Sequence, residues 1–338
     1  MDSIAALDIG GGTQDFLLWD PNQPLENSVK AVWPSPTQAV AARIRRARDQ
    51  DRDVFLHGWL MGGGAMATAV DEHIDAGLKV RATPQAAASL HDDPAKVQAM
   101  GVEIADDPLP DAVTIFTTDL DLFRINQTLA KFEVPPPQTW AVAVCDHGYA
   151  PGNSNRKFRF SIWQDFLAAG GKMDDLITQA PPSHLTRMQA IVGQCPGAWV
   201  MDTAAAALWG ALEDPEVASL AQEGVCVVNL GNMHTVAFLV KGHVVSGIYE
   251  HHTGCLDVAT LSGHITRFMS GDISDDEVFD CRGHGCAFLP DAPGKQLPVV
   301  ITGPQRRLAE GLGWRTAVPH GDVMLSGCFG LLAAVKNY

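Results

Sequence analysis

The stretch Asp8-Ile9-Gly10-Gly11-Gly12-Thr13-Gln14-Asp15 places a glycine triplet between two carboxylates. Apolar runs at residues 4–7 and 16–19 flank it, and both have the length and composition of β-strands. Glycine lets backbone N–H groups converge on an anion, Thr13 adds a hydroxyl donor, and Asp8 can hold Mg²⁺ through water. The stretch predicts a strand–turn–strand unit that handles a nucleotide phosphate; a glycine-rich hairpin with solvated Asp side chains is the alternative.

The pattern Asp-x-Gly-Gly-Gly-Thr-x-Asp resembles the first phosphate motif of the actin, sugar-kinase and heat-shock-chaperone ATPase superfamily, and four further stretches follow in that superfamily's order. Residues 201–210, which are rich in Ala, resemble its first connecting helix, where small side chains let two domains cross closely. A helix former packed in a core is the plain alternative. Residues 324–334 supply Ser326, Gly327 and Gly330 and resemble the second connecting helix.

The other two stretches resemble nucleotide-contacting turns of the same superfamily. Residues 225–240 form a strand, a polar turn and a strand like the second phosphate motif, but Asn229 stands where an Asp usually begins the turn. An amide oxygen can accept a hydrogen bond from a metal-bound water, but it brings no charge and takes no proton. Residues 299–307 resemble the adenosine motif, with Pro304 in place of a common second Gly and at the start of an expected helix.

The resemblance implies an α/β fold with two actin-like, ribonuclease H-like domains, mixed sheets flanked by helices, and a nucleotide cleft between the domains. Residues 1–212 and 322–338 would form the first domain, with an insertion around 60–180, and residues 213–321 the second. The implied cofactors are ATP and Mg²⁺, the latter held by Asp8 through water. The implied cofactor-binding residues are Asp8, Gly10, Gly11, Gly12, Thr13, Gln14, Asp15, Asn229, Gly231, Asn232, Thr235, Gly303, Pro304 and Gln305.

Between the motifs, the sequence predicts a strand at 27–33, a helix at 38–49 and a strand at 53–57, as in the hairpin-then-crossover pattern of the first actin-like domain. Gly62-Gly63-Gly64 then opens a helix that runs to residue 76. We expect this glycine-rich entry to line the interdomain cleft, and a loose Gly-x-Gly-x-x-Ala dinucleotide pattern is the alternative. Residues 113–116 predict a strand and residues 122–132 a helix.

An apolar run at residues 140–145 predicts a buried strand that ends in Asp146-His147-Gly148. Polar residues at the end of such a strand are where catalytic groups tend to lie, so Asp146 and His147 are the leading acid–base pair, with Asp202 as a third candidate. Neighbours on an extended strand point to opposite faces, and a turn former beside an exposed His is the alternative. Residues 152–160, with three cations and two aromatics, would recognise an anionic substrate or form a surface hairpin.

Two His-containing clusters lie in the second half of the chain. Residues 250–257 close a predicted strand and begin a helix at Thr253, and Cys281-Arg282-Gly283-His284-Gly285-Cys286 forms a compact loop. Thiols and imidazoles can bind Zn²⁺, so Cys281, His284 and Cys286 are candidate transition-metal ligands, with a fourth from His251, His252 or Cys255. In the alternative, the thiols are small buried hydrophobes around a glycine turn.

Composition narrows the classes of partner. The 338 residues allow two domains with a core in each, and the net charge of −15 argues against a nucleic-acid-binding surface. Long uninterrupted apolar stretches are absent from the sequence, the N-terminus begins directly with a strand, and seven cysteines fit reduced thiols, so we expect a cytoplasmic protein that does not enter a membrane. A nucleotide and a small-molecule or protein substrate are the expected partners, and an oligomer is compatible with the sequence.

The chain as a whole also resembles a family of prokaryotic proteins of unknown function that are often labelled pyruvate formate-lyase activating enzyme-like. Such activases need three closely spaced cysteines for an iron–sulfur cluster, and the seven cysteines of this chain offer no such triplet. We therefore do not expect a radical activase. The sequence favours an ATP-dependent phosphotransferase or ATP hydrolase; a nucleotide-dependent switch that activates a partner, and a metal-binding redox protein, are the alternatives.

Overall fold

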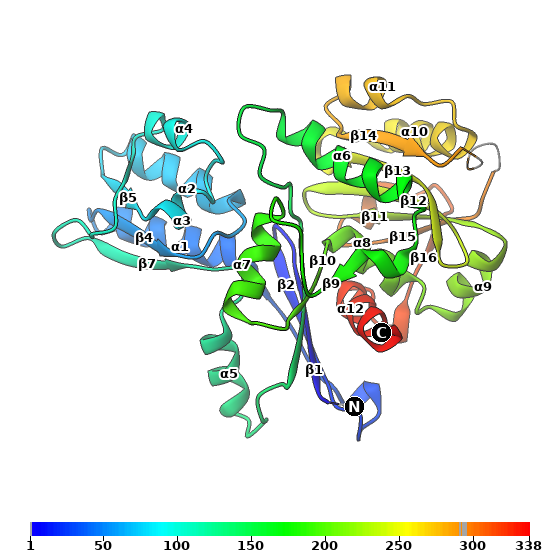
Figure 1. The fold of residues 1–338 in the computed structure, drawn as a ribbon, viewed down its shortest axis with the longest axis horizontal. Helices are drawn as coiled ribbons and strands as arrows, with labels where there is room; N and C mark the ends of the chain where they lie inside the picture. Colours follow the sequence, from blue (N-terminus) through cyan, green and yellow to red (C-terminus); the bar gives the residue numbers. More distant parts are fainter. Residues whose placement is uncertain (1, 291, 293–295) are drawn as a thin grey trace.

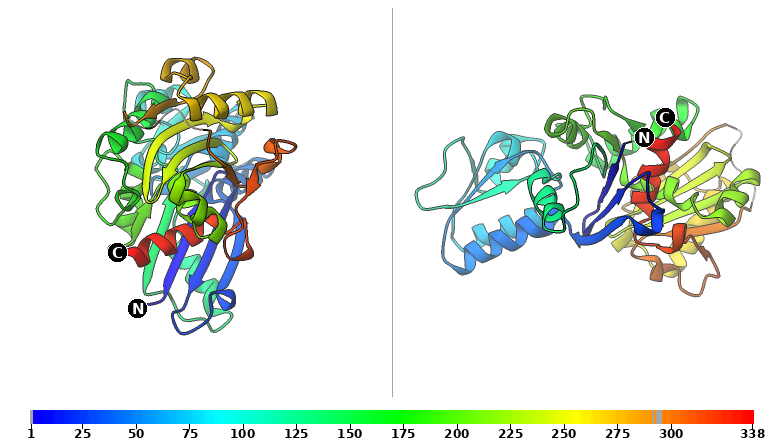
Figure 2. Two further views of the ribbon diagram at one scale, coloured as in Figure 1. Left: turned by 90° about the vertical axis from the view of Figure 1, so that its right-hand side faces the viewer. Right: turned by 90° about the horizontal axis from the view of Figure 1, so that it is seen from below.

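The computed structural model describes residues 2–290, 292 and 296–338, and it has an α/β fold built on three sheets flanked by helices. Two of the sheets are mixed and contain six strands each, and the third contains four. The mixed sheets lie side by side, and the four-stranded sheet stands apart at one end of the molecule (Figures 1 and 2). The expected α/β class with mixed, helix-flanked sheets is therefore confirmed.

The first mixed sheet begins with the glycine-rich motif and has the order β3-β2-β1-β8-β10-β9. β1, β2 and β3 pair antiparallel, and β8 and β10 continue the sheet parallel to β1. Its strands are β1 (Ile4–Ile9), β2 (Thr13–Trp19), β3 (Val29–Pro34), β8 (Thr139–Val144), β9 (Ile177–Thr178) and β10 (Trp199–Met201).

The second mixed sheet repeats this plan with the order β14-β13-β12-β11-β15-β16. β11, β12 and β13 pair antiparallel, and β15 and β16 extend the sheet parallel to β11. Its strands are β11 (Val225–Leu230), β12 (His234–Lys241), β13 (Val244–His252), β14 (Gly285–Phe288), β15 (Val299–Thr302) and β16 (Arg315–Thr316). The expected structural echo between the two strand–turn–strand units is confirmed, because β1 and β11 each lie between an antiparallel hairpin partner (β2 or β12) and a parallel strand (β8 or β15).

The third sheet is entirely parallel, with the order β6-β5-β4-β7, and its strands fall between β3 and β8 in the chain. They are β4 (Val54–Gly58), β5 (Val80–Ala82), β6 (Val102–Ile104) and β7 (Val113–Thr117). The predicted strand at residues 53–57 forms as β4, but the crossover from the hairpin leads into this third sheet and does not return to the first. The parallel neighbour of β1 is β8, because the chain builds this additional sheet before it returns to β1.

Several helices begin at side-chain caps: Asp202, Asp257 and Ser154 each accept a backbone N–H in the first turn of the helix that follows. The α-helices are α1 (Pro36–Asp49), α2 (Gly64–Asp75), α3 (Pro84–Ala87), α4 (Pro94–Ala99), α5 (Leu122–Ala130), α6 (Asn155–Ala168), α7 (Thr186–Gln194), α8 (Thr203–Ala211), α9 (Pro215–Glu223), α10 (Val258–Ser270), α11 (Asp275–Asp280) and α12 (Ser326–Asn337). Short 3₁₀ helices cover Leu25–Asn27, Met173–Leu176, Thr253–Cys255, Arg306–Ala309 and Pro319–Gly321.

Three local predictions need correction. Residues 152–160 do not form a surface hairpin, because Ser154 caps α6 and the cations and aromatics lie on that helix. No α-helix starts at Pro304 in the described chain; β15 is followed by a turn and the 3₁₀ helix Arg306–Ala309. The segment after β13 forms the 3₁₀ helix Thr253–Cys255 first, and α10 starts only at Val258, with Asp257 as its N-cap.

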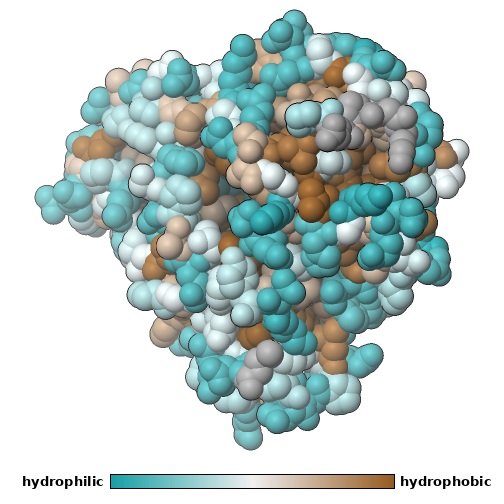
Figure 3. Space-filling view, turned by 45° about the vertical axis from the view of Figure 1, so that its right-hand side comes forward, coloured by the Kyte–Doolittle hydropathy of each residue, from teal (hydrophilic) through white to brown (hydrophobic). Residues whose placement is uncertain are grey.

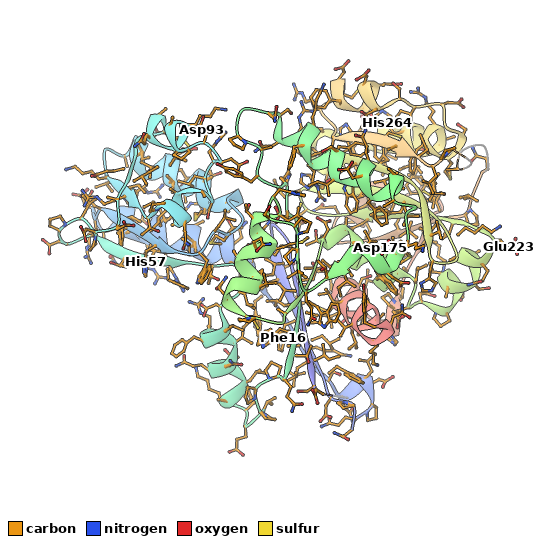
Figure 4. All side chains as sticks on the ribbon, viewed as in Figure 1. Phe16, His57, Asp93, Asp175, Glu223 and His264 are labelled. Atoms are coloured by element: carbon orange, nitrogen blue, oxygen red, sulfur yellow. The ribbon has the colours of Figure 1, made fainter. Side chains whose placement is uncertain are left out.

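The main core joins the two mixed sheets through α8 and α12, which lie between them (Figure 2). One continuous apolar cluster contains Leu17 of β2, Phe238 of β12, and Leu208 and Phe329 of these two helices. A second cluster fills the other face of the first sheet against α5 and α7, and includes Phe16, labelled in Figure 4. The relative position of the two mixed sheets is thus set by what lies between them.

The helices α8 and α12 approach each other backbone to backbone. A Cβ atom at Gly210 would overlap the carbonyl oxygen of Ser326, and one at Gly330 would overlap the carbonyl oxygen of Ala206. Only residues without a side chain fit at these two positions. The resemblance of residues 201–210 and 324–334 to a pair of closely crossing helices is confirmed by this contact.

Within the described residues, none of the helices combines the length and apolar character needed to cross a membrane. The face shown in Figure 3 is largely hydrophilic, with apolar side chains in separate patches. This mixture is ordinary for a protein surface in water.

The crossing predicts a large difference between two Gly→Ala substitutions in helices. Gly330→Ala should destabilise the protein by about 1–3 kcal/mol, the usual cost of overpacking, because its Cβ meets backbone that cannot turn away. Gly263→Ala in α10 is the matched control: a Cβ there meets nothing within 4 Å, so we expect a gain of about 0.5–1 kcal/mol from helix propensity. Urea unfolding of both variants measures the two effects; equal stability of the pair would contradict the close crossing.

Candidate functional site

A cavity of about 550 Å³ lies where the two mixed sheets and the third sheet meet. Both strand–turn–strand units border it, as do the loops that follow β4, β5, β8 and β15. The candidate site residues from the sequence that line the cavity include Asp8, Gly10, Gly11, Thr13, Asp15, Asp146, His147, Asn229, Gly231, Asn232, His252, His284, Gly303 and Pro304. Segments far apart in the chain therefore converge on one hollow.

The two turns at the cavity have the same backbone geometry. In the first, the N–H of Gly10 donates to the carbonyl of Thr13 at 2.9 Å; in the second, the N–H of Gly231 donates to the carbonyl of His234 at 3.0 Å. Asp8 and Asn229 hold the same place, two residues before the glycine, on β1 and β11. Asn229 is thus the structural counterpart of Asp8, and the second turn brings an amide where the first brings a carboxyl group.

The tips of the two turns touch. A Cβ atom at Gly11 would lie 2.8 Å from Cγ of Met233, and one at Gly12 would lie 2.7 Å from Nδ2 of Asn232. The glycine triplet therefore allows the two turns to meet as well as shaping the first of them. Gly10 and Thr13 of the first turn and Gly231 and Asn232 of the second also line the cavity.

Asp8 is a partly buried acid beside the first turn. One of its oxygens, Oδ1, has no hydrogen-bond partner among the described residues, and the other lies against Gly327 in the first turn of α12. Burial, followed by the nearby carboxylates of Asp15 and Asp202, raises the pKa of Asp8 well above its ordinary value. A bound cation would give Oδ1 of Asp8 a partner, and its positive charge would stabilise the ionised carboxylate.

Four of the residues implied as cofactor ligands lie outside the cavity lining. The side chain of Gln14 points to the other side of β2 and donates to the carbonyl of Pro34. Thr235 is buried and bonded to Thr253, Gln305 donates to Asn232, and Gly12 packs against Asn232. Gln14 and Thr235 therefore support the strands, while Gln305 and Gly12 support the second turn.

The side chains of Asp146 and His147, at the end of β8, have different surroundings and different roles. Asp146 accepts the backbone N–H groups of Gly148 and Met188, at 2.9 and 3.0 Å, so both of its oxygens are used to hold the loop after β8. His147 faces the ring of His234, with 5.1 Å between the centroids. Burial, followed by the Arg159 charge, lowers the pKa of His147.

Asp202 belongs to a buried ion network beneath the cavity rather than to its lining. Its carboxylate caps α8 and accepts a hydrogen bond from Nη1 of Arg159, at 2.5 Å. Arg159 also donates to Glu250 of β13 at 3.2 Å, and Trp163 donates to the same carboxylate at 2.8 Å. Although burial opposes its charge, Glu250 keeps a lowered pKa because of Arg159 and the surrounding histidines.

Four histidines gather above Glu250, and sequence reasoning did not bring them together. The ring centroids of His234 lie 5.1 Å from His252 and 4.8 Å from His284, and those of His252 and His284 lie 4.6 Å apart. Burial is the main cause that lowers the pKa of His252 to about 4 and of His284 to about 3, so both imidazoles are neutral near pH 7.

The cysteine loop is not assembled as a metal site. Among the described residues, the groups of ligating atoms close enough for one ion are Cys145 with His147 and His234, and His234 with His252 and His284. Neither group contains Cys281, which is exposed, or Cys286, which is buried in the core beside β13. His284 faces the other histidines instead of the two thiols that flank it in the sequence.

The inserted sheet contributes the remaining wall. Gly62, Gly63 and Gly64 line the cavity at the start of α2, as expected for a glycine-rich entry, together with residues 88–92 after α3. Arg187 of α7 fixes this wall through its pair with Asp119, at 2.8 Å, and donates to the carbonyl of Cys145. The third sheet is thus tied to the end of β8.

Comparison with known proteins identifies the family. The model of a family described as "Putative pyruvate format-lyase activating enzyme (DUF1786)" matches residues 61–308. The chain belongs to this family. The seven cysteines of this DUF1786 chain, at positions 145, 195, 226, 255, 281, 286 and 328, do not include the closely spaced triplet that the iron–sulfur cluster of such activases needs.

No curated protein matches this DUF1786 chain. Among solved structures, the ethanolamine utilization protein EutJ from Carboxydothermus hydrogenoformans is 12% identical, with a TM-score of 0.36 over 98% of this chain and 89% of that one. The PPX-GPPA enzyme of Aquifex aeolicus is 10% identical, with a TM-score of 0.26 over 90% and 68%. A PilM-PilN type IV pilus biogenesis complex is 12% identical, with a TM-score of 0.34 over 98% of each chain. Similarity of this degree assigns no activity.

The buried Asp15 of the glycine-rich motif at residues 8–15 should make the stability of the protein depend on pH. Burial is the main cause that raises its pKa to about 7, so the folded protein binds a proton that the unfolded chain releases near pH 4. Wild-type stability relative to Asp15→Asn should therefore be highest below about pH 4 and fall by about 1–4 kcal/mol as the pH rises to 7. Urea unfolding of chelator-treated protein measures this difference. Asp49→Asn, at an exposed carboxylate, is the control; a flat difference for Asp15→Asn would contradict the raised pKa.

Proposed function

We propose that the cavity binds ATP with Mg²⁺ and that the protein is an ATP-dependent phosphotransferase or ATP hydrolase. The observation that carries this proposal is the pair of matching turns, from β1–β2 and β11–β12, that border one cavity. Backbone N–H groups at such turns suit an anion, and two turns on opposite sides suit a polyphosphate. The strand order that the two mixed sheets share, β3-β2-β1-β8-β10 in one and β13-β12-β11-β15-β16 in the other, further supports an actin-like arrangement.

In this arrangement, residues 1–212 with 322–338 form one actin-like domain and residues 213–321 the other, with the nucleotide between them. Residues 10–13 and 231–235 would contact the phosphates, and Gly303 and Pro304, which line the cavity after β15, the nucleoside. The third sheet then belongs to an insertion in the first domain. Its glycine-rich loop would cover the phosphates or an acceptor.

Asp8 is the residue that fits Mg²⁺. It lines the cavity, and its buried Oδ1 has no hydrogen-bond partner in the described chain. Bound Mg²⁺ would neutralise charge on the phosphate oxygens, which is its usual contribution to phosphoryl transfer. Asn229, opposite Asp8, would accept a hydrogen bond from a metal-bound water without adding charge.

His147 is the candidate to orient or deprotonate the attacking group. Its side chain lines the cavity, and it makes no hydrogen bond to a described residue. Asp146 and Asp202 are less suited, because backbone N–H groups and Arg159 occupy their oxygens. The acceptor would be a water or a hydroxyl group of a small molecule or protein.

A second function is favoured by one specific residue. Because Asn229 stands where the superfamily usually has an Asp, the second turn lacks a carboxylate. Without that charge, the turnover of ATP should fall more than its binding. The protein would then be a nucleotide-dependent switch that activates a partner enzyme with little hydrolysis. Turnover separates this function from the first.

Asp8→Asn tests the cation site with an isosteric change. We expect Mg²⁺-dependent ATP binding to weaken at least about tenfold, because the amide cannot supply the charge that Mg²⁺ requires. Isothermal titration with and without Mg²⁺ measures this, and Asp49→Asn at the exposed end of α1 is the control. Unchanged affinity in Asp8→Asn would remove Asp8 from the site.

Asn229→Asp tests the two functions against each other. If the protein is a weakened hydrolase, restoring the carboxylate opposite Asp8 should raise steady-state ATP turnover about tenfold or more. If it is a switch, turnover should stay near zero while ATP affinity changes little. A coupled assay of phosphate release, run with and without small hydroxylated metabolites, distinguishes these results.

A further inference from the structure

We propose that His234, His252 and His284 form a binding site for one zinc-class divalent ion in the wall of the cavity. Each offers a ring nitrogen, and the three ligating atoms lie within 4.8 Å of one another. Imidazole nitrogen suits Zn²⁺ and its transition-metal neighbours, whereas Mg²⁺ and Ca²⁺ prefer oxygen. This site is separate from the one proposed at Asp8 and does not depend on nucleotide binding.

The three ligands come from three segments that the second sheet brings together. His234 begins β12, His252 ends β13 opposite it in the antiparallel register, and His284 immediately precedes β14. The backbone N–H of His284 donates to the carbonyl of Glu250 with an N···O distance of 2.8 Å. This hydrogen bond holds the backbone of His284 against β13. The imidazoles are therefore carried by paired strands, a rigid support that suits a metal site.

The side chain of His284 gives an independent indication of a missing ligand. The residue is 1% exposed, and both of its ring nitrogens lack a hydrogen-bond partner within the described structure. A buried polar group without a partner is costly, and nearly all such groups in folded proteins are bonded. His284 nevertheless lies against two further imidazoles at the cavity, which is the arrangement that a metal ion would satisfy.

The groups around the three histidines also suit a cation. Glu250, completely buried beneath them, places Oε1 3.7 Å from Nδ1 of His234, beyond hydrogen-bond distance but close enough to bring a negative charge beside a bound cation. Cys145 lies on the same side, with its sulfur 3.4 Å from Nδ1 of His234. Because all three histidines line the cavity, a three-imidazole site would leave a fourth position open for water or a ligand oxygen, as in catalytic zinc sites.

Titration of tag-free, chelator-stripped full-length protein with Zn²⁺ tests the site, with a chromophoric chelator as competitor and no nucleotide present. We expect one ion per chain. His252→Ala should weaken binding at least a hundredfold, whereas His184→Ala, at an exposed histidine outside the cluster, should retain it. Wild-type protein without a stoichiometric site would overturn the proposal, whether or not any variant folds.

Two further variants identify the ligands. Cys281→Ser should bind Zn²⁺ like the wild type; loss of binding would move the site to the cysteine loop and overturn the three-histidine set. Substitution with Co²⁺ should give the visible spectrum of a four-coordinate ion without a sulfur-to-metal charge-transfer band. A band that Cys145→Ser abolishes would show that Cys145 binds the ion, and the proposed ligand set would then be wrong.

The Asp8→Asn variant separates this site from the nucleotide proposal. It should weaken Mg²⁺-dependent ATP binding and leave Zn²⁺ binding unchanged, while His252→Ala should keep its fold and weaken Zn²⁺ binding. Circular dichroism and thermal unfolding of the metal-free proteins report the fold. Zn²⁺ binding that disappears in Asp8→Asn would contradict a separate histidine site.

Discussion

The backbone contact between α8 and α12 is the constraint on which the cavity depends. The two helices lie between the mixed sheets, and Gly210 and Gly330 bring them closer than any side chain would allow. β1 and β11 lead directly from this core to the two turns, so the spacing of the helices sets the spacing of the turns. The contact of Gly11 and Gly12 with Met233 and Asn232 follows from the same close approach.

A buried network of charges holds the floor of the cavity. Arg159 joins Asp202, at the start of α8, to Glu250 in β13, and therefore ties the helix layer to the second sheet. Three charges removed from water are tolerable only because each is paired and hydrogen-bonded. Asp202, a catalytic candidate from the sequence, is therefore held in an ion pair with Arg159. The histidines above Glu250 lie beside the negative charge of that carboxylate.

The features that could be predicted from the sequence are those formed by residues close together in the chain. The glycine turn, the small-residue helices and the strand ending in Asp146 and His147 all carry local signals, and each formed. Gln14 was misplaced although strand alternation would have separated it from Thr13 and Asp15. The third sheet and the histidine cluster could not be predicted in this way, because His147, His234, His252 and His284 come from four segments that only the strand pairing brings together.

The cations that line the cavity are already engaged. Arg159 and Arg187 pair with carboxylates, and Arg156 donates to the carbonyls of Phe279 and Gly283. A chain with a net charge of −15 adds no general attraction for an anion. A polyphosphate in this cavity would therefore need its positive charge from backbone N–H groups and from bound metal. Asp8 is where we propose that the described chain holds such an ion, so polyphosphate binding in this cavity would depend on Mg²⁺ bound there.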